Sequence, residues 1–462
     1  MAEVPSRAGP DAPDGVRGVT FDAPHGRADG DAGIYVPSMF ESLRVRDFRF
    51  LWVSNLAATF GMHMQIVARG WLIYDLTRSA MALSWVMLSF MLPSFVFSLA
   101  GGVIADRLRK KAIMLISQVL NACSTALLGW IIYTGRVTFA HFIYFGIFNG
   151  TVLSFSMPAR TSVVPEVVGR KSLVNAMALQ SATFNLSRIL GPALAGALIA
   201  VFAHGNTTST EGVGIVFFVI AVFSVVSVIS TAQLNYSGAP LKRAGSTAIE
   251  DMKEGVRYMR DERLVLGLLM LGFVPMTFGF SASSLLPAFN KEVIHGGPED
   301  LGLMMTAMGV GALAGSLALA HVGDIGGKGR MMFMSAYGWA AALGGFAVSS
   351  SLWLAMLLGA CTGLFGAVCG SVNMSIVQLT VRPEIRGRVM SLMMMAQGLM
   401  PIGILPISAV AEKTGIHIAL MLAALLLAIS MIWIGRAFPD LIRIDKGHAG
   451  EAIAPAAPAA GR

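Results

Sequence analysis

The chain has 462 residues, of which 55% are hydrophobic and only 13% are charged, and its mean hydropathy is +0.69. A soluble core of this size could not bury so much apolar surface, so the composition excludes a soluble globular protein and indicates that most of the chain faces lipid. The formal net charge of +8 follows from the distribution of Lys and Arg across a membrane and requires no nucleic-acid partner.

The first segment, residues 1–38, is rich in Pro, Gly, Ala and Asp. It contains no apolar stretch that would serve as the central region of a signal peptide. This composition predicts a disordered cytoplasmic tail, and the Ala- and Pro-rich segment 438–462 is predicted to be a second tail.

Twelve apolar runs follow, each long enough to cross a bilayer as a helix of roughly twenty residues. They begin near Phe50, Met81, Ala112, Phe139, Asn175, Ile215, Leu264, Gly302, Met331, Leu352, Val389 and Ile418. The predicted fold is an all-α polytopic membrane protein with twelve transmembrane helices in two six-helix pseudo-repeats. The predicted bundles span residues 39–234 and 264–437, and the long connection 235–263 is predicted to be a cytoplasmic linker.

The orientation follows from Lys and Arg, because acidic residues contribute little to the positive-inside bias. Of the 34 Lys and Arg residues, all but six fall in the tails and in the loops on the same side as the tails. The opposite side carries Arg78, Arg136, Lys291 and Lys413, while Arg69 and Arg188 lie within predicted helices. Both termini are therefore predicted to be cytoplasmic. The expected location of this multi-pass protein is a bacterial plasma (inner) membrane.

Three short matches recur at one fixed offset of 218 residues. They pair Thr59-Phe60-Gly61 with Thr277-Phe278-Gly279, Asp106 with Asp324, and Pro165-Glu166-x-x-Gly169-Arg170 with Pro383-Glu384-x-x-Gly387-Arg388. A constant spacing across three separate regions indicates a duplicated half, fused head to tail. The function must therefore suit a machine with two-fold symmetry.

Enzymatic chemistry finds no support in the sequence, and no cofactor or metal site is predicted. The three cysteines all fall inside predicted helices, which favours neither a disulfide framework nor a thiolate metal site. Neither a His-Glu-x-x-His nor a Gly-x-Ser-x-Gly pattern occurs. Gly309-x-Gly311-x-x-x-Gly315 lies in a predicted helix without a preceding strand, so we expect it to serve close helix packing and not to bind a dinucleotide.

The loop between the second and third predicted helices runs Gly-Val-Ile-Ala-Asp-Arg-Leu-Arg-Lys-Lys from Gly102 to Lys111. This segment resembles the signature loop of the major facilitator superfamily, although Arg109 replaces the usual later Gly. The resemblance implies that Asp106 contacts the opposing half of the protein when the cytoplasmic side is closed. The second copy, around Asp324, has lost the Arg that follows the Asp.

The partner of Asp106 is expected at the start of helix eleven, where Arg386, Arg388 and the positive end of the helix all favour an anion. By the same symmetry, Asp324 would face Arg170. The remaining charges of the predicted cytoplasmic gate would pair within their own halves, Glu166 with Arg107 or Lys110 and Glu384 with Lys328 or Arg330. The alternative is that all these charges are only topology signals and solvated loop ends.

A closer resemblance covers most of the chain between Asp47 and Arg388. Its segments are Asp47-Phe48-Arg49-Phe50-Leu51-Trp52, Trp71 to Ser79, Pro158-Ala159-Arg160, Asn185 to Pro192, Glu254 to Tyr258 and Leu286-Pro287-Ala288-Phe289. These segments are similar to the enterobactin-exporter-type branch of the superfamily. The resemblance implies export of siderophores or drugs, generally driven by proton exchange.

The ionisable residues near the middle of the predicted helices are His63 and Arg188, at similar depths on the first and fifth helices. An Arg in mid-membrane normally faces the bundle interior and a partner, so Arg188 is the leading substrate or coupling residue, suited to phenolate or carboxylate groups. His63 is the candidate proton carrier. The alternatives are an Arg that holds backbone carbonyls or Gln65 in a fixed helix contact, and a purely structural His.

Two further features complete the predicted site. Its other polar candidates are Gln65, Gln397, Asn373, Gln180 and Asn185, and Gln397 is the best placed of those in the second half. Gly191 and Pro192 resemble the Gly-Pro motif of exporters in the superfamily, and Pro removes one helix hydrogen bond, so a bend is predicted there. An ordinary membrane-helix kink is the alternative.

The sequence therefore predicts a monomeric secondary transporter in the lipid bilayer. It would export an amphipathic small molecule, a siderophore or a drug, in exchange for protons, through a central site opened alternately to each side. One alternative is uptake of an organic anion, for which Arg188 would serve equally. Another is a polytopic scaffold or sensor that transports nothing.

Overall fold

The computed structural model describes residues 40–203, 210–236, 238, 263–323, 326–381, 389, 393 and 400–444. Within these ranges the side chains of residues 98–107, 170–171, 263–264 and 401–402 are not described. The described segments are helical and contain no strand, which confirms the predicted all-α class. The predicted N-terminal tail, most of the predicted linker and residues 445–462 of the second predicted tail lie outside the described residues. Residues 438–444 of the second predicted tail are described. They include a short 3-10 helix, η3 (Pro439–Leu441), and the Leu441 side chain is fully buried, so the folded part of the chain extends beyond the predicted boundary at residue 437.

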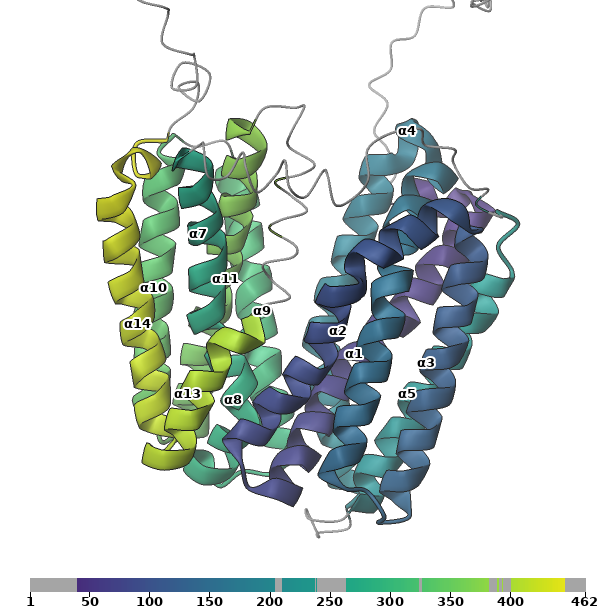
Figure 1. Cartoon of the computed structure of the whole chain (residues 1–462), viewed down its shortest axis with the longest axis horizontal. Helices are drawn as coiled ribbons and strands as arrows, with labels where there is room; N and C mark the ends of the chain where they lie inside the picture. The colour runs from purple at the N-terminus through teal and green to yellow at the C-terminus, as the bar shows by residue number, and fades with distance from the viewer. Residues whose placement is uncertain are drawn as a thin grey trace, which may run out of the picture. The chain divides into compact units, whose positions relative to one another are not determined.

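The helices fall into two bundles that follow each other along the chain (Figure 1). The first comprises α1 (Arg46–Thr77), α2 (Ala80–Arg107), α3 (Lys110–Tyr133), α4 (Phe139–Phe202) and α5 (Thr210–Ala232). The second comprises α7 (Arg263–Gly279), α8 (Ser281–Phe289), α9 (Pro298–Val322), α10 (Lys328–Val348), α11 (Leu352–Thr380), α13 (Met400–Thr414) and α14 (Ile416–Ala437).

Ten helical segments in the described ranges are long and apolar enough to cross a membrane. α4 supplies two of them, residues 139–169 and 172–202, and α7 and α8 form one together. Helix α1 and the described part of α13 occupy the two remaining positions in the predicted series of twelve. Because hydrocarbon offers no hydrogen bonds, a chain with many apolar spans must satisfy its backbone within helices.

α4 turns back on itself at Gly169, where φ is 66° and ψ is 177°. Glycine adopts a positive φ without the steric cost that a Cβ would bring, which explains its place in the repeated Pro-Glu-x-x-Gly-Arg motif. The break also corrects the sequence analysis at Arg160. That residue was counted among the basic residues of a loop, but it lies inside the first of the two spans of α4.

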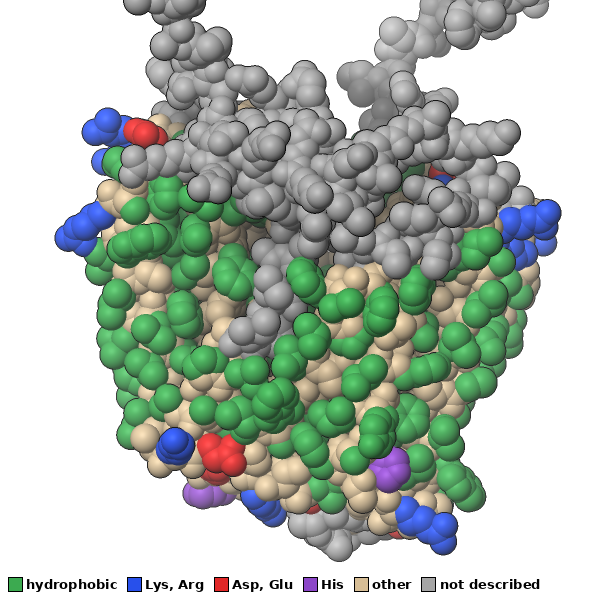
Figure 2. Space-filling model, viewed as in Figure 1, with side chains coloured by type: hydrophobic (Ala, Val, Ile, Leu, Met, Phe, Trp, Pro, Cys, Tyr) green, Lys and Arg blue, Asp and Glu red, His purple; other side chains and the backbone are tan. Residues whose placement is uncertain are grey.

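The surface separates apolar from charged side chains, as expected for a protein in lipid. On the face shown in Figure 2, hydrophobic side chains cover the middle of the molecule, and the described charged side chains gather towards its two ends. Large apolar side chains such as Trp85, Trp130, Trp353 and Trp433 are exposed. The protein is a multi-pass membrane protein.

The two copies of the repeat make the same local bonds. The Thr59 hydroxyl donates a 2.7 Å hydrogen bond to the carbonyl oxygen of Asn55. Its counterpart Thr277 donates one of 2.9 Å to the carbonyl oxygen of Phe273. The contacts between the bundles are also duplicated, because the second span of α4 packs on α9 and the corresponding pair, α13 and α2, packs likewise. The 218-residue offset therefore relates equivalent positions in space.

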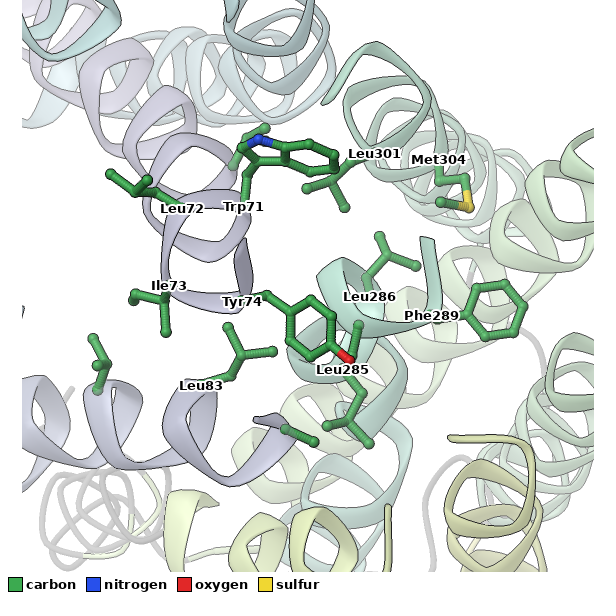
Figure 3. Close-up of a cluster of buried hydrophobic side chains, with 14 of the residues drawn as sticks. Trp71, Leu72, Ile73, Tyr74, Leu83, Leu285, Leu286, Phe289, Leu301 and Met304 are labelled. Carbon is green, nitrogen blue, oxygen red and sulfur yellow. The ribbon is translucent and has the colours of Figure 1, made fainter. Parts of the chain in front are cut away.

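The end of the bundles that carries the loops around Arg78, Arg136, Lys291 and Lys413 is here named the predicted external end, and the opposite end the predicted cytoplasmic end. Among the described residues, the buried apolar side chains form three clusters. One is shared by both bundles and includes Trp71, Leu285 and Leu301 (Figure 3). The other two belong to one bundle each and lie towards the predicted cytoplasmic end.

Helices α9 and α11 interlock through glycines. A Cβ at Gly315 would lie 2.6 Å from the carbonyl oxygen of Leu364, and one at Gly311 would overlap the carbonyl oxygen of Ala360. From the other side, a Cβ at Gly363 would overlap the carbonyl oxygen of Met308. The expectation that the Gly309–Gly315 run serves close helix packing is confirmed. Small residues let two backbones approach, which is how membrane helices gain contact energy without a hydrophobic driving force.

Replacing Gly311 with Ala should lower the melting temperature in detergent, because the added methyl group must push α9 away from α11. Overpacking of this kind costs roughly 1–3 kcal/mol. Gly344→Ala is the matched control, since a Cβ there makes only an ordinary 3.7 Å contact with Ala424 and Ala favours the helix. Equal melting temperatures for the two variants, measured by thermal unfolding of the purified protein, would contradict the proposed packing.

Candidate substrate and gating site

Arg188 lies in the second span of α4. Its Nη2 donates a 3.1 Å hydrogen bond to Oδ1 of Asn185, one turn earlier on the same helix. Its Nε is buried and has no hydrogen-bond partner among the described residues. Leaving a buried donor unpaired costs about 1–3 kcal/mol. A ligand that accepts a hydrogen bond from Nε would offset that cost.

His63 faces the same part of α4 from α1. Its Nδ1 lies 2.9 Å from the carbonyl oxygen of Thr59, so in the neutral ring Nδ1 carries the proton and Nε2 is the acceptor. The ring packs edge-on against Phe184, with 5.2 Å between centroids. A Cβ at Gly191 would lie 2.8 Å from the Cβ of His63. The helices that carry His63 and Arg188 therefore touch one turn away from Arg188.

Two glutamines, Gln65 and Gln397, complete the predicted site. Gln65 is half-buried on α1, two residues beyond His63, while the described hydrogen bond of Arg188 goes to Asn185. Gln397 lies outside the described residues. Their roles stay predictions.

The interface between the second span of α4 and α9, here called the seam, passes beside Arg188. The Thr306 hydroxyl donates a 2.8 Å hydrogen bond to the carbonyl oxygen of Ile189. A Cβ at Gly309 would lie 3.1 Å from the carbonyl oxygen of Arg188, and one at Gly302 would lie 2.6 Å from that of Pro192. The predicted bend at Gly191 and Pro192 thus lies where the two bundles cross, with small side chains on both sides.

Polar contacts join the two bundles at the predicted external end. Tyr74 at the end of α1 donates a hydrogen bond to Oε1 of Glu292. Asp75 pairs with Lys291, and the two side chains are only 8% and 15% exposed. The Lys291 ammonium also lies 4.6 Å from the ring centroid of Trp71, a cation–π geometry. Figure 3 shows Trp71 and Tyr74 beside the apolar side chains of α8 and α9.

The sequence separation of these pairs identifies the symmetry axis. Tyr74 and Glu292 are 218 residues apart, which is the repeat offset, so two equivalent positions touch each other. Equivalent positions meet only on a two-fold axis. Asp75 and Lys291, 216 residues apart, lie on either side of it. The internal duplication thus places a polar contact on the pseudo-two-fold axis of the bundle pair.

A second set of contacts at the same end joins α2 to α13. Oε2 of Glu412 accepts hydrogen bonds from the Ser79 hydroxyl at 2.9 Å and from the Met81 backbone N–H at 3.1 Å. One turn further along α2, the hydroxyls of Ser84 and Ser408 lie 2.5 Å apart. The bundles are therefore tied together at the predicted external end.

At the predicted cytoplasmic end, Lys110 and Glu166 form an ion pair within the first bundle. This is one of the two pairings expected for Glu166. The Tyr236 hydroxyl donates to the other oxygen of the same carboxylate. The remaining residues of the predicted gate have no described side chain, namely Asp106, Arg107, Arg170, Asp324, Glu384, Arg386 and Arg388.

The sequence analysis did not assign Arg69 or Arg160 to the candidate site. The structure places both side chains in the first bundle, against neighbouring helices. The Arg160 Nη2 donates a 2.9 Å hydrogen bond to Oδ1 of Asn55 on α1. The Arg69 guanidinium lies 5.9 Å from the ring centroid of Phe90 on α2. Arg160 follows Pro158, which read as the start of a loop, and only the position of the helix end at Gly169 shows that Arg160 belongs to a span.

The second bundle contains a small cavity of about 60 Å³ between α7, α11 and α13, lined by Gly272, Met276, Met393, Met400 and Asn373 among others. Oδ1 of Asn373 is buried without a hydrogen-bond partner in the described part of the chain. Sequence reasoning gave Asn373 no particular rank. The sequence indicates little about the role of Asn373, because an isolated Asn in an apolar helix does not reveal which way its side chain points.

A family profile described as "Transmembrane secretion effector" matches residues 37–447. The chain belongs to this family, which is part of the major facilitator superfamily. The chain is 24% identical to the staphyloferrin A transporter of Staphylococcus aureus over 80% of its own length and 90% of the relative. It is 26% identical to the multidrug efflux pump Tap of Mycolicibacterium fortuitum over 82% and 94%. The protein is an efflux-type transporter of the superfamily and not an enzyme.

Solved structures agree on the fold. A D-xylose–proton symporter superposes with a TM-score of 0.68 at 14% identity, covering 86% of this chain and 99% of that one. A bacterial homologue of the human lysosomal transporter Spinster, solved facing inward, superposes with a TM-score of 0.60 at 14% identity, covering 86% and 96%. The major facilitator fold that the loop motif implied is thereby confirmed.

The variant Asp75→Asn should weaken closure at the predicted external end of this transporter, because it removes the charge that pairs with Lys291. We expect a several-fold rise in the population with separated bundle ends. The measurement is the distance distribution between spin labels at Leu76→Cys and Lys413→Cys, in a background without the three native cysteines.

The charge-swapped double variant Asp75→Lys/Lys291→Asp is the control and should restore the closed distance. Identical distributions for wild type and Asp75→Asn would show that the ion pair does not hold this end closed.

Proposed function

We propose that this transporter exports amphipathic small molecules, siderophores or drugs, in exchange for protons by alternating access. The observation that carries the proposal is Arg188, whose Nε is buried without a partner in the described residues. The backbone of the same residue lies on the seam between the two bundles. A ligand bound at Arg188 would touch both bundles and sense their relative motion.

The contact pattern supports a rocking motion. Polar pairs and a shared apolar cluster join the bundles at the predicted external end. Towards the predicted cytoplasmic end, each bundle has an apolar cluster of its own. This arrangement fits a state that accepts substrate from the cytoplasm. Release outside would then require the external contacts to break and a cytoplasmic gate to form.

The cytoplasmic gate in this proposal consists of the charged residues named from the sequence. Asp106 would pair with Arg386 or Arg388, and Asp324 with Arg170. The Lys110–Glu166 pair would hold the end of the first span of α4 against the start of α3 throughout the cycle. His63 is the proposed proton carrier, because an imidazole can both take up and release a proton.

The proposal is supported by the relatives as well as by the geometry. The names of the staphyloferrin A transporter and of Tap describe siderophore transport and drug efflux. The enterobactin exporter EntS of Citrobacter koseri, 24% identical over 64% of this chain and 68% of the relative, is a siderophore exporter by name. The same membrane orientation, with both termini in the cytoplasm of a bacterial cell, is part of the proposal.

Purified protein in liposomes tests the coupling. We expect catecholate siderophores, added to one side, to drive a change of internal pH with wild type and not with Arg188→Gln, because the neutral side chain no longer attracts the anionic ligand. Hydrophobic cations, which Arg188 does not attract, are the comparison ligands. Arg136→Gln, an exposed arginine outside the spans, is the matched control and should behave as wild type.

Proton movement that is unchanged in Arg188→Gln would make Arg188 structural. Transport of the ligand without any pH change would refute proton exchange. Net accumulation of an organic anion driven by an inward proton gradient would favour the uptake alternative, since Arg188 suits an anion in either direction.

Asp106→Asn should reduce turnover roughly ten-fold, the rate effect of about 1.4 kcal/mol, because the externally open state loses its cytoplasmic ion pair. The melting temperature should stay close to that of wild type. The measurement is initial export rate in liposomes at saturating ligand, alongside thermal unfolding. Wild-type flux through a well-folded Asp106→Asn protein would refute the gate.

A further inference from the structure

We infer that the transported molecule is an organic anion with more than one acidic group, guided by Arg69, Arg160 and Arg188 at three levels along α1. This inference rests on the proposed export function and specifies its substrate class. It combines the contacts of the three arginines, their arrangement along α1, and their absence from the duplicated half.

No described carboxylate neutralises the three guanidinium groups. Arg160 bonds to the amide of Asn55, Arg188 bonds to the amide of Asn185, and Arg69 lies over the ring of Phe90. None of the ion pairs within the described residues includes any of them. An arginine within a membrane costs roughly 2.5–3.5 kcal/mol even on the lowest insertion scales, so three uncompensated arginines call for an anion.

The described carboxylates of α1 do not supply this compensation. The acidic residues of α1 are Asp47 and Asp75, near its two ends. Asp47 accepts hydrogen bonds from the backbone N–H groups of Asn235 and Tyr236, and Asp75 pairs with Lys291. The sequence of the segment 389–400, which includes residues outside the described set, contains no Asp or Glu. Within the described residues nothing supplies the counter-charge, which points to an anionic ligand.

The three arginines lie at three levels along the axis of α1 and are here called the arginine column. Arg160 contacts α1 at Asn55, the turn after Arg188 meets α1 at His63, and Arg69 belongs to α1 itself. At 1.5 Å per residue these levels are about 12 and 9 Å apart along the helix axis. An elongated small molecule would bridge two neighbouring levels and pass from one to the next.

The face of α1 between these levels is open. Asn55 and Arg69 are fourteen residues apart, close to four turns, so they share a face. Met62 and Ile66 lie between them on that face and are 43% and 40% exposed. Charged side chains in membrane spans nearly always face a bundle interior or a water-filled cavity. The column therefore borders an aqueous path that a ligand can enter.

The repeat shows that the fold does not need these cations. At the 218-residue offset, Arg69 corresponds to Pro287, Arg160 to Gln378 and Arg188 to Pro406. The second bundle forms the equivalent helices without any of the three charges. If the arginines only fixed helix contacts, both copies would need such contacts. Their restriction to one half marks them as a binding feature that the duplicated scaffold acquired separately.

Two dyes built on the same xanthene ring system test the charge preference. Carboxyfluorescein carries several acidic groups, whereas rhodamine 123 is a cation. We expect saturable binding of carboxyfluorescein to the full-length protein in detergent, measured by fluorescence anisotropy, and binding of rhodamine 123 at least ten-fold weaker. The salt dependence of carboxyfluorescein binding should be steep, because the attraction is between charges.

Each of Arg69→Gln and Arg160→Gln should weaken carboxyfluorescein binding roughly ten-fold, as expected for one lost charge-assisted contact. Arg69→Lys and Arg160→Lys, which keep the charge, should retain most of the affinity and identify losses due to misfolding. Gln378→Ala, at the position equivalent to Arg160, is the control in the second half and should change the affinity less than two-fold.

The inference is overturned if carboxyfluorescein shows no saturable binding, if rhodamine 123 binds as tightly, or if both Gln variants bind like wild type. Its failure is distinguishable from that of the proposed export. Proton movement driven by a hydrophobic cation in liposomes, together with absent carboxyfluorescein binding, would leave proton-coupled export standing and refute only the anionic substrate.

Discussion

The cost of placing a charge in hydrocarbon governs the arrangement of this protein. Its described carboxylates lie at helix ends and in loops, and there they make the polar contacts that join helices. Glu166 ties α3 to α4, and Asp75, Glu292 and Glu412 tie the two bundles together at the predicted external end. Deeper in the membrane the bundles meet through small residues such as Gly302 and Gly309. Hydrogen bonds and an ion pair join the bundles at the predicted external end, and small residues let the helices pack closely deeper in the seam. This arrangement suits two rigid bundles that rock about a central seam.

The internal duplication explains where the bundles meet. A two-fold axis requires equivalent positions to touch, and Tyr74 and Glu292 do so at the repeat offset. The contacts of α4 with α9 and of α13 with α2 are equivalent in the same way. Symmetry thus supplies the scaffold and the seam. The two halves differ in polar side chains, since Arg69, Arg160 and Arg188 have no arginine at the equivalent positions of the second bundle. The second bundle in turn contains the buried amide of Asn373.

Much of the fold could be predicted from the sequence because it depends on local composition. The apolar runs predicted where the spans begin, near Ala80, Phe139 and Leu352. The spacing of the glycines in α9 predicted that this helix packs closely against a neighbour. Partner choice could not be predicted in the same way. Nothing local to Asp75 indicates Lys291, because that pairing depends on how two bundles far apart in sequence come together. Arg160 was misplaced since a proline and an arginine resemble a loop, whereas the span continues to Gly169. The partners predicted for Asp106 and Asp324 remain predictions.

The absence of acidic residues from the middle of the spans also bears on energetics. Moving one elementary charge across a membrane is worth roughly 2.3 kcal/mol per 100 mV. In a cell with a negative interior, an anion leaving and a proton entering both move down the potential. Export of an anion would therefore draw on the membrane potential directly, and a single proton carried by a neutral group such as His63 would suffice for exchange. The arginine column, without a central carboxylate, would suit such a cycle. In the proposed cycle the cations would hold the substrate's charge in the membrane, and the potential would drive the substrate outward.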